Sequence, residues 1–591
     1  MNRDDQPVVS GLSCLLLAVL FAAGLVHLGV RLKEVQIDDS ADYRYANVRQ
    51  SVRKVQTAGV RGRILDRRGT VLAANRRSVS IVCQPTAFQK RSWDATAKAI
   101  EDAVAAVAAA IGRPSPLSAN AVRRHIRQSL AMPLVAWRDV DERELAVFSE
   151  REAEFPGFAV EETVEREYPE GELAAHVVGY VGRDRVEADA GDEKYNFVTT
   201  ELRGRSGLES YYDGFLRGVP GERNLLVDAR GFAIRGWTVV EARRGLDLRL
   251  SLDAEIQREA ERQLLGEVGA CAVINPANGE VLALASSPGY QLNSFVPTLS
   301  HEVYARYAED PAKPLLNRAS GGLYAPGSTF KPITALAGLK SGWPVQETYD
   351  CTGVFSLGSL SLRCSSRWGH GALDVRHAIM KSCNPFFCGL GMSIGTNALV
   401  GAARAFGLGK KTGLDLGVDA AGVVPDGEWK SRTYHEPWYP GDLAQMSIGQ
   451  GMLLVTPLQM ARAAGSIGTG YLVTPHLKLD APVERKMLPF SASQLAVVRD
   501  GMRMVVGGDG ESRGTGWRGG EGVPVRVSGK TGTAEVGVGE RRRKNTWFIA
   551  YAPSERPTVA AAMVIENGES GGVTAAPRVC AILKTAFGRP D

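Results

Sequence analysis

A serine and a lysine three positions apart, Ser328 and Lys331, are the side chains in this sequence best suited to nucleophilic chemistry. The preceding Pro326-Gly327 predicts the start of a helix, and residues i and i+3 share one face of a helix. A serine hydroxyl is a poor nucleophile until a base removes its proton, and a lysine serves as that base when burial or a neighbouring cation lowers its pKa. Backbone N–H groups at the helix start would stabilise a developing oxyanion.

Two further motifs follow in the same half of the chain, Ser382-Cys383-Asn384 and Lys530-Thr531-Gly532. The second follows an apolar run, so its backbone is expected at a sheet edge beside the nucleophile. Each of the three short patterns occurs a second time in the chain, at Ser51-Val52-Arg53-Lys54, Ser118-Ala119-Asn120 and Lys411-Thr412-Gly413. We interpret these second copies as a solvated stalk, a helix cap and a helix-ending loop. Order and context therefore separate the chemical set from its copies.

The chain from residue 248 onward carries signals for helices mixed with an antiparallel sheet. A helix is predicted over 253–265, followed by a hairpin with strands at 270–274 and 280–285. The strands are joined through Asn278-Gly279, which is a strong turn signal. Further strands are predicted over 525–528, 546–551 and 558–565. We therefore predict an α+β fold, with an antiparallel sheet flanked by helices, for residues 248–591.

The segment before residue 248 predicts a separate mixed α/β unit. Residues 61–73 indicate two short strands about a turn. Ser92 and Ser118 are predicted helix caps, because each precedes apolar residues spaced along one helical face. Pro156-Gly157 ends this helical portion. Arg243-Arg244-Gly245 marks a boundary, since alternating leucines begin directly after it.

Residues 8–30 form an almost wholly apolar stretch, long enough to cross a bilayer as one helix. A buried helix and a cleaved signal peptide are the alternatives, but the run lacks a basic leader and a clear cleavage site. We predict a membrane anchor at 8–30, a cytoplasmic tail at 1–7 and a polar stalk from 31 to about 60. Two basic residues follow the stretch and one precedes it. Because basic residues favour the cytoplasmic side, this bias opposes an extracytoplasmic position for the catalytic part. Long domains, however, translocate largely regardless of such flanking charge.

Composition excludes several classes of protein. The 591 residues are 44% hydrophobic and 23% charged, which excludes a disordered, collagen-like or polytopic membrane chain. The formal net charge of +5 is small for this length, so no nucleic-acid partner is expected. Eight cysteines are too few for a scaffold built on disulfides.

Cys351, Cys364, His370 and Cys383 bring three of the eight cysteines and one histidine into a short segment. Three thiolates and one imidazole make a closed tetrahedral zinc site of the structural type. The alternative is one disulfide with unrelated buried thiols, which an oxidising compartment would permit. Cys383 lies inside the Ser-x-Asn motif, so a metal there would fix the catalytic loop directly. Cys388 is a spare thiol that would compete.

The complete set of motifs resembles the class B penicillin-binding proteins, which are D,D-transpeptidases of peptidoglycan. The resemblance covers nearly the whole chain and implies an anchor, a non-catalytic pedestal at 31–247 with a helical head at about 88–156, and a penicillin-binding transpeptidase domain at 248–591. Trp438-Tyr439-Pro440-Gly441-Asp442 and Ser447-Ile448-Gly449-Gln450-Gly451 resemble the penicillin-binding protein 2 branch, which serves cell elongation. Pedestal motifs that carry the resemblance include Arg61-Gly62-Arg63-Ile64-Leu65-Asp66, Arg166-Glu167-Tyr168-Pro169 and Gly204-Arg205-Ser206-Gly207-Leu208-Glu209.

The resemblance implies a role for each motif residue. Ser328 would be acylated by a stem peptide with release of D-alanine, and Lys331 would be its base. Ser382 would relay protons and Asn384 would hold the donor amide. The substrate carboxylate would meet Lys530, Thr531, Gly532 and Thr533, and the oxyanion would meet the backbone N–H groups of Ser328 and Thr533. An amine of a second stem peptide would then take the acyl group, whereas β-lactams would remain on the serine.

The resemblance also implies partners and leaves alternatives open. Some members carry zinc in this region, with carboxylates where this chain has Cys351 and Cys364. Expected partners are peptidoglycan stem peptides, β-lactams, the membrane and a polytopic glycosyltransferase of the RodA type. One alternative is a pedestal that mainly binds and activates that glycosyltransferase. The other is a β-lactam hydrolase, although no Glu-x-x-Asn motif that would activate water follows Asn384.

Overall fold

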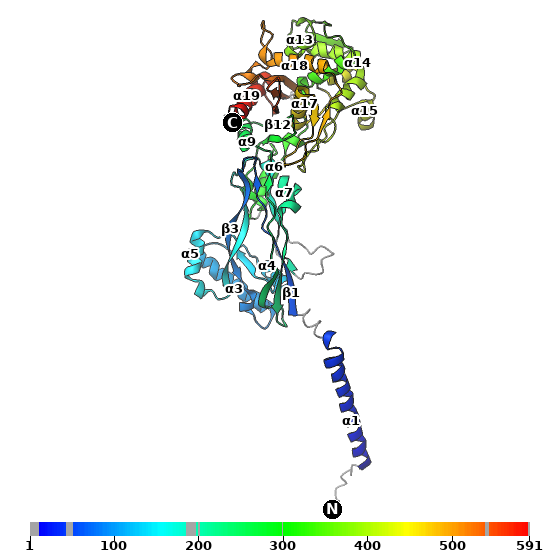
Figure 1. Ribbon diagram of the computed structural model, residues 1–591. Helices are drawn as coiled ribbons and strands as arrows, with labels where there is room; N and C mark the ends of the chain where they lie inside the picture. The colour runs from blue at the N-terminus through cyan, green and yellow to red at the C-terminus, as the bar shows by residue number, and fades with distance from the viewer. Residues whose placement is uncertain are drawn as a thin grey trace, which may run out of the picture.

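The computed structural model describes residues 11–42, 51–184, 197–198, 201–297, 299–537 and 543–588. The molecule is elongated, with helix α1 at one end, a slender pedestal in the middle and a globular C-terminal domain at the other end (Figure 1). Helix α1 spans Gly11–Lys33 and buries none of its residues against the rest of the chain. Its length and apolar composition suit a membrane span, as predicted for 8–30. The predicted cytoplasmic tail at 1–7 lies outside the described residues.

The membrane-proximal part of the pedestal is a four-stranded sheet in the order β10-β9-β1-β7. Its strands are β1 (Val52–Thr57), β7 (Phe197–Val198), β9 (Gly221–Val227) and β10 (Ala233–Val240). The prediction of a polar stalk to about residue 60 is therefore wrong at its end, and so is our interpretation of Ser51–Lys54 as solvated stalk. Val55 of β1 is buried, and β1 pairs with β7 on one side and with β9 on the other. No local pattern could reveal that pairing, because the partners are so distant in sequence.

The rest of the pedestal is organised by one long strand. β3 (Val71–Cys83) pairs with β2 (Ile64–Leu65), β4 (Leu134–Trp137) and β5 (Phe158–Glu167). The head helices are α3 (Trp93–Ile111), α4 (Ala119–Ser129) and α5 (Glu142–Glu150). Ser92 and Ser118 accept hydrogen bonds from Ala95 N and Ala121 N, so both predicted caps are confirmed.

Three pedestal segments meet at a buried ion network. Glu209 accepts hydrogen bonds from Arg61 Nε at 2.6 Å and from Arg166 Nε at 2.7 Å, and all three side chains are almost fully buried. Asp213 binds the second arm of Arg61 at 2.8 Å. Removing one partner from such a network costs about 3–5 kcal/mol, because the remaining charge is left buried and unpaired. The network joins segments that lie 43 to 148 residues apart in the sequence.

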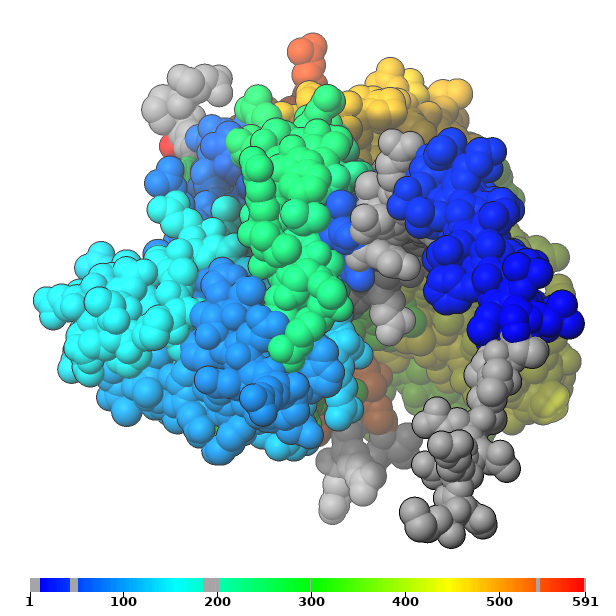
Figure 2. Space-filling model, turned by 90° about the horizontal axis from the view of Figure 1, so that it is seen from below, coloured from blue at the N-terminus to red at the C-terminus, as the bar shows by residue number. Residues whose placement is uncertain are grey.

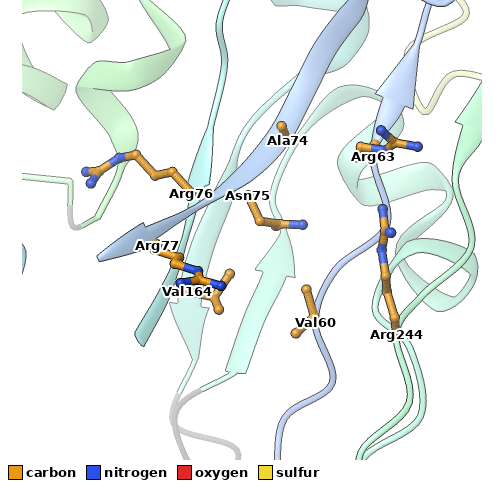
Figure 3. Close-up of a pocket in the computed structure, with 8 residues that line it drawn as sticks. All are labelled: Val60, Arg63, Ala74, Asn75, Arg76, Arg77, Val164 and Arg244. Atoms are coloured by element: carbon orange, nitrogen blue, oxygen red, sulfur yellow. The ribbon is translucent and has the colours of Figure 1, made fainter. Parts of the chain in front are cut away.

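Two hollows are lined by residues of the pedestal that the structure describes. The larger, about 1860 Å³, lies between the head and the membrane-proximal sheet; seen from below, the head helices and the β9–β10 hairpin stand as neighbouring lobes (Figure 2). The smaller, about 350 Å³, has Arg63 and Arg244 on one side and Arg76 and Arg77 on the other (Figure 3). Asp247 pairs with Arg63 and Arg244, and Asp139 pairs with Arg76, so two carboxylates face four guanidinium groups. Neither hollow is lined by a residue of the three chemical motifs.

The C-terminal domain is built on a five-stranded antiparallel sheet in the order β13-β12-β22-β21-β20. The strands are β12 (Gly269–Ile274), β13 (Val281–Ser287), β20 (Ser528–Val536), β21 (Arg543–Ala552) and β22 (Val559–Glu566). The predicted α+β class, the 270–285 hairpin and the two last strands are confirmed. The strand predicted at 525–528 instead begins at Ser528 and runs through the Lys-Thr-Gly motif, because its alternating polar residues are paired with β21.

Helices cover both faces of this sheet. Cys271 and Val273 point into a core with α9 (Ala254–Gln263) and α19 (Ala576–Phe587). Their neighbours on β12 point into the larger core on the other face, which holds the catalytic helices. Those helices are α12 (Lys331–Lys340), α13 (Val375–Lys381), α14 (Asn384–Ala405), α16 (Pro440–Ser447), α17 (Pro457–Thr469) and α18 (Ala492–Gly507).

Candidate active site

The nucleophile candidate lies on a tight turn at the start of α12. Residues Gly327–Phe330 form one 3₁₀ turn, and α12 continues from Lys331. Ser328 is partly exposed, whereas Lys331 is fully buried. The predicted helix start after Pro326-Gly327 is confirmed, with a 3₁₀ turn in place of a first α-turn. Side chains at i and i+3 nearly eclipse in a 3₁₀ turn, so Ser328 and Lys331 share a face.

The turn is clamped from two sides. Gly327 donates its N–H to Gly449 O at 2.8 Å, and a Cβ on Gly449 would lie only 2.0 Å from Gly327 O. On the other side a Cβ on Gly327 would lie 2.8 Å from Thr533 O. Trp547 of β21 donates its indole N–H to Ala325 O at 3.0 Å. The sequence analysis used Gly449 only as part of the resemblance to the penicillin-binding protein 2 branch and did not predict this contact. The Ser-x-Gly-x-Gly pattern is the signal that could have indicated it, because glycines allow close backbone approach.

Lys331 reaches the second motif. Its Nζ donates to Ser382 O at 2.7 Å and to Asn384 Oδ1 at 2.6 Å, and Ser382 Oγ lies 3.4 Å away. Burial lowers the pKa of the Lys331 ammonium to about 8. The structure therefore brings Lys331, Ser382 and Asn384 together, with a lysine that loses its proton more easily than an exposed one.

The Ser-x-Asn motif forms the junction between two helices. Ser382 ends α13 with φ of 58°, in the left-handed region that side chains other than glycine rarely adopt. Its N–H donates to Ile379 O at 3.2 Å, and Cys383 N donates to Ala378 O at 3.0 Å. Such a conformation costs roughly 1–2 kcal/mol and persists only where the surroundings impose it. The bend turns Ser382 and Asn384 toward Lys331 and Cys383 toward the thiol cluster.

The third motif lies within the edge strand β20. Lys530 is fully buried, and burial, followed by the charge of Lys331, holds the pKa of its ammonium well below its usual range. Lys530 Nζ donates to Thr531 O at 2.9 Å. Thr531 Oγ1 donates to Thr515 Oγ1 at 2.9 Å, and Thr533 Oγ1 accepts from Gly571 N at 3.4 Å. A carboxylate bound beside Lys530 would stabilise the ammonium form that burial disfavours.

The four predicted metal ligands converge beside the same loop. Their ligand atoms all lie within 4.8 Å of one another. Cys351 Sγ and Cys364 Sγ lie 3.8 and 3.4 Å from His370 Nδ1, and Cys364 Sγ lies 4.0 Å from Cys383 Sγ. Tetrahedral ligands around zinc, at bond lengths of 2.0–2.3 Å, are separated by about 3.5–3.8 Å. The residues present therefore fit a zinc ion in number, type and spacing.

The thiols of this cluster are free rather than bridged. The Cys364–Cys383 separation is about twice the length of a disulfide bond. The hydrogen bond between these two thiols lowers the pKa of Cys364 and raises that of Cys383. Cys388 lies apart from the cluster and donates to Ala444 O at 3.6 Å.

The second copies of two motifs have other tasks. Ser118 caps α4, as predicted. Thr412 donates to Asp419 Oδ1 at 3.1 Å within a loop that turns at Gly413, so the Lys411 copy is also a loop, as predicted.

Comparison with known proteins gives a consistent result. The family described as penicillin binding protein transpeptidase domain matches residues 269–584, and the penicillin-binding protein dimerisation domain matches residues 56–250. The peptidoglycan D,D-transpeptidase MrdA of Acinetobacter baumannii is 32% identical over 94% of this chain and 85% of its own. The Escherichia coli K12 protein of the same name is 31% identical over 96% and 91%.

Solved structures resemble the whole chain. Penicillin-binding protein 2 of Helicobacter pylori, in its complex with MreC, has a TM-score of 0.79 at 27% identity and covers 91% of this chain and 99% of its own. A chain from a peptidoglycan synthase complex that coordinates polymerisation and crosslinking has a TM-score of 0.71 at 29% identity, and covers 98% and 99%.

Proposed function

The chain belongs to the class B penicillin-binding proteins as a penicillin-binding protein 2-like peptidoglycan D,D-transpeptidase, and on that premise we propose which residues perform its reaction. Ser328 is the acylated nucleophile and Lys331 its general base. The observation that carries this proposal is the buried Lys331 Nζ, which sits one 3₁₀ turn from Ser328 and is held by Ser382 and Asn384.

The reaction has two halves. Neutral Lys331 takes the Ser328 proton while Oγ attacks the carbonyl carbon between the last two D-alanines of a stem peptide. The carbonyl oxygen becomes an oxyanion, which the backbone N–H groups of Ser328 and Thr533 stabilise. Collapse of this intermediate breaks the C–N bond and releases D-alanine, whose amine takes a proton. An amine of a second stem peptide then attacks the ester, forms the crosslink and returns the proton to Ser328.

Ser382 relays a proton, and Asn384 positions Lys331 and the donor peptide. Ser382 Oγ lies 3.4 Å from Lys331 Nζ, so it passes the proton from the lysine to the leaving amine. Asn384 orients Lys331 through Oδ1 and donates its amide N–H to Arg363 O at 2.7 Å. The second N–H of the Asn384 amide then aligns the donor peptide.

The Lys-Thr-Gly strand binds the terminal carboxylate of the donor. Lys530 supplies positive charge, and Thr531 and Thr533 supply hydroxyls on one face of an extended strand. Gly532 lies between them, and a Cβ there would approach Thr329 Cγ2 to 2.8 Å. A glycine therefore lets β20 lie close to the nucleophile turn. An arriving carboxylate would stabilise the charged form of Lys530, which burial alone disfavours.

A structural zinc ion bound by Cys351, Cys364, His370 and Cys383 is part of the proposal. When bound, the ion cross-links four ligands from separate segments and stabilises their fold. Cys383 lies between Ser382 and Asn384 in the sequence, so a metal bound to its thiolate would also hold the catalytic loop in place. No step of the acyl transfer involves the metal.

The setting of the reaction follows from the anchor. Helix α1 fixes the chain to the plasma membrane, and we propose that the pedestal and the catalytic domain lie on the extracytoplasmic (periplasmic) side, where the peptidoglycan substrate is. Relatives are seen with MreC and in a complex that couples polymerisation to crosslinking. These support a role in cell elongation beside a RodA-type glycosyltransferase, with the pedestal as its contact.

Intact mass after incubation with a penicillin tests the proposal. The full chain should gain one stable penicillin adduct, and the Ser328→Ala variant should gain none. A short-lived adduct with release of penicilloic acid would instead support the hydrolase. A folded chain that takes no penicillin would support a mainly scaffolding role.

A further inference from the structure

The amide of Asn384 connects the catalytic lysine to a neighbouring segment of the chain. Its Oδ1 accepts from Lys331 Nζ at 2.6 Å, and its Nδ2 donates to Arg363 O at 2.7 Å. The residue after Arg363 is Cys364, and the residue before Asn384 is Cys383. The two Sγ atoms of these cysteines lie 4.0 Å apart. Two free thiols are therefore in contact directly beside the hydrogen bond that holds Asn384.

The thiol cluster is open to solvent on one side. Cys351 and Cys383 are buried, whereas Cys364 and His370 are partly exposed. Oxidation of a cysteine depends on its thiolate character and on its exposure, and a sulfur bound to zinc is a thiolate. Cys364 is therefore the sulfur of the cluster that a dissolved oxidant reaches first. The buried sulfur of Cys383 beside it is placed to complete a disulfide.

Formation of that disulfide would disturb the hold on the catalytic lysine. The two sulfurs must approach each other by about 2 Å to reach the length of a disulfide bond. Cys364 N donates to Gly353 O at 2.9 Å and Cys383 N donates to Ala378 O at 3.0 Å, so both backbones are anchored. The two hydrogen bonds of Asn384 lie between these anchored segments. Because such bonds weaken steeply beyond about 3.2 Å, a shift of about 0.5 Å in either segment loosens the lysine.

We propose that Cys364 and Cys383 form an oxidation site, at which a dissolved disulfide compound joins the two sulfurs and reversibly switches off the enzyme. The proposal rests on the transpeptidase function and adds a regulation of the same site.

The chemistry is thiol–disulfide exchange in two steps. The Cys364 thiolate attacks one sulfur of the compound, and the other sulfur of the compound leaves as a thiolate. The Cys383 thiolate then attacks Cys364 Sγ of this mixed disulfide, and the second half of the compound leaves as a thiolate. Two electrons pass from the protein sulfurs to the sulfurs of the compound. The cluster then keeps only Cys351 and His370 as ligands, too few for a closed zinc site.

The test uses the full chain in detergent, purified with a reductant and zinc. After the reductant is removed, the chain is incubated with oxidised glutathione. We expect release of about one zinc per chain to a colorimetric chelator, and a Cys364–Cys383 disulfide in a non-reduced peptide map. Penicillin acylation should become at least about tenfold slower, because Lys331 is no longer held in place. Dithiothreitol with added zinc should restore the original rate.

Two variants separate this pair from oxidation elsewhere, each compared with its own untreated sample. Cys364→Asp keeps a carboxylate that can bind zinc but cannot form a disulfide. Its acylation rate should change by less than about twofold on oxidation. Cys388→Ala removes a thiol that lies outside the cluster, so oxidation should slow its acylation as strongly as in the parent.

Absence of the Cys364–Cys383 disulfide after oxidation would overturn the proposal, and so would a disulfide that leaves acylation unchanged. A loss of acylation that dithiothreitol and zinc do not reverse would also overturn it, because damage is not a switch. A parent that takes no penicillin before oxidation contradicts the transpeptidase assignment of Ser328 instead. The peptide map then still decides whether the two thiols form a redox pair.

Discussion

Lys331 Nζ lies 2.6 Å from Asn384 Oδ1, so a direct hydrogen bond joins the last residue of the Ser-x-x-Lys motif to the last residue of the Ser-x-Asn motif. The lysine is thereby aimed at the Ser-x-Asn loop and kept out of water. A neutral amine in this position can still accept the Ser328 proton, because its lone pair turns toward the nucleophile once one N–H is lost. Burial of the lysine and activation of the serine are thus two results of one arrangement.

The acylation rate should depend on pH through Lys331. Burial lowers its pKa to about 8, and only the neutral amine is a base. The rate of penicillin acylation should therefore rise about tenfold per pH unit below 8 and level off above it. Stopped-flow measurement of adduct formation between pH 6 and 9.5 checks this. Lys331→Arg, which stays protonated, should show no such rise; a flat profile in the parent would contradict the base role.

Ser382→Ala should slow acylation by about 100-fold with little loss of fold, because the proton relay is removed while the loop geometry remains. Ser382→Gly removes the same hydroxyl but relieves the left-handed backbone at φ of 58°. It should therefore have a higher Tm than Ser382→Ala and the same slow rate. Adduct kinetics and thermal unfolding of the two variants separate relay from strain. Normal acylation in both would refute the relay.

Gly449→Ala should displace the nucleophile turn. The added Cβ would lie 2.0 Å from Gly327 O, and the positive φ of 74° adds strain. We expect acylation to fall by at least about tenfold and Tm to fall by several degrees. Gly507→Ala is the matched control, since nothing lies within 4 Å of its added Cβ. Equal rates in Gly449→Ala and the control would show that the clamp does not position Ser328.

The full chain should contain about one zinc per molecule by elemental analysis. Chelation, or His370→Ala, should lower Tm and slow acylation together, because the ligand Cys383 holds the catalytic loop. Cys388→Ala is the control, since its thiol lies outside the cluster. Absence of metal, with Cys351 and Cys364 found joined in a non-reduced peptide map, would eliminate the site.

Local signals in the sequence sufficed for much of the fold. The caps at Ser92 and Ser118, the Asn278-Gly279 hairpin and the last two strands depend on near neighbours, and they were predicted correctly. The sequence predicts a stalk where β1 lies, because the burial of β1 depends on its pairing with β9, far along the chain. The predicted strand ends at residue 528, before the polar Lys530 and Thr531, whereas β20 continues to Val536 and buries both residues.

In the candidate site, too, local sequence signals were enough to predict some features but not others. Residue types and order were enough to separate Ser328, Lys331, Ser382 and Lys530 from their second copies, and the spacing was enough to group three cysteines and one histidine whose side chains converge. The clamp by Gly449 and the partial exposure of Cys364 were not predictable. Each depends on the relative placement of separate loops, and no spacing in one segment encodes that.

The anchor and pedestal have a consequence for where crosslinks form. Helix α1 and the catalytic domain lie at opposite ends of an elongated molecule (Figure 1). With α1 in the bilayer, Ser328 samples only a thin layer at a height set by the pedestal, and its local concentration there is high. The length of the pedestal would then set the distance from the membrane at which a new strand joins the wall.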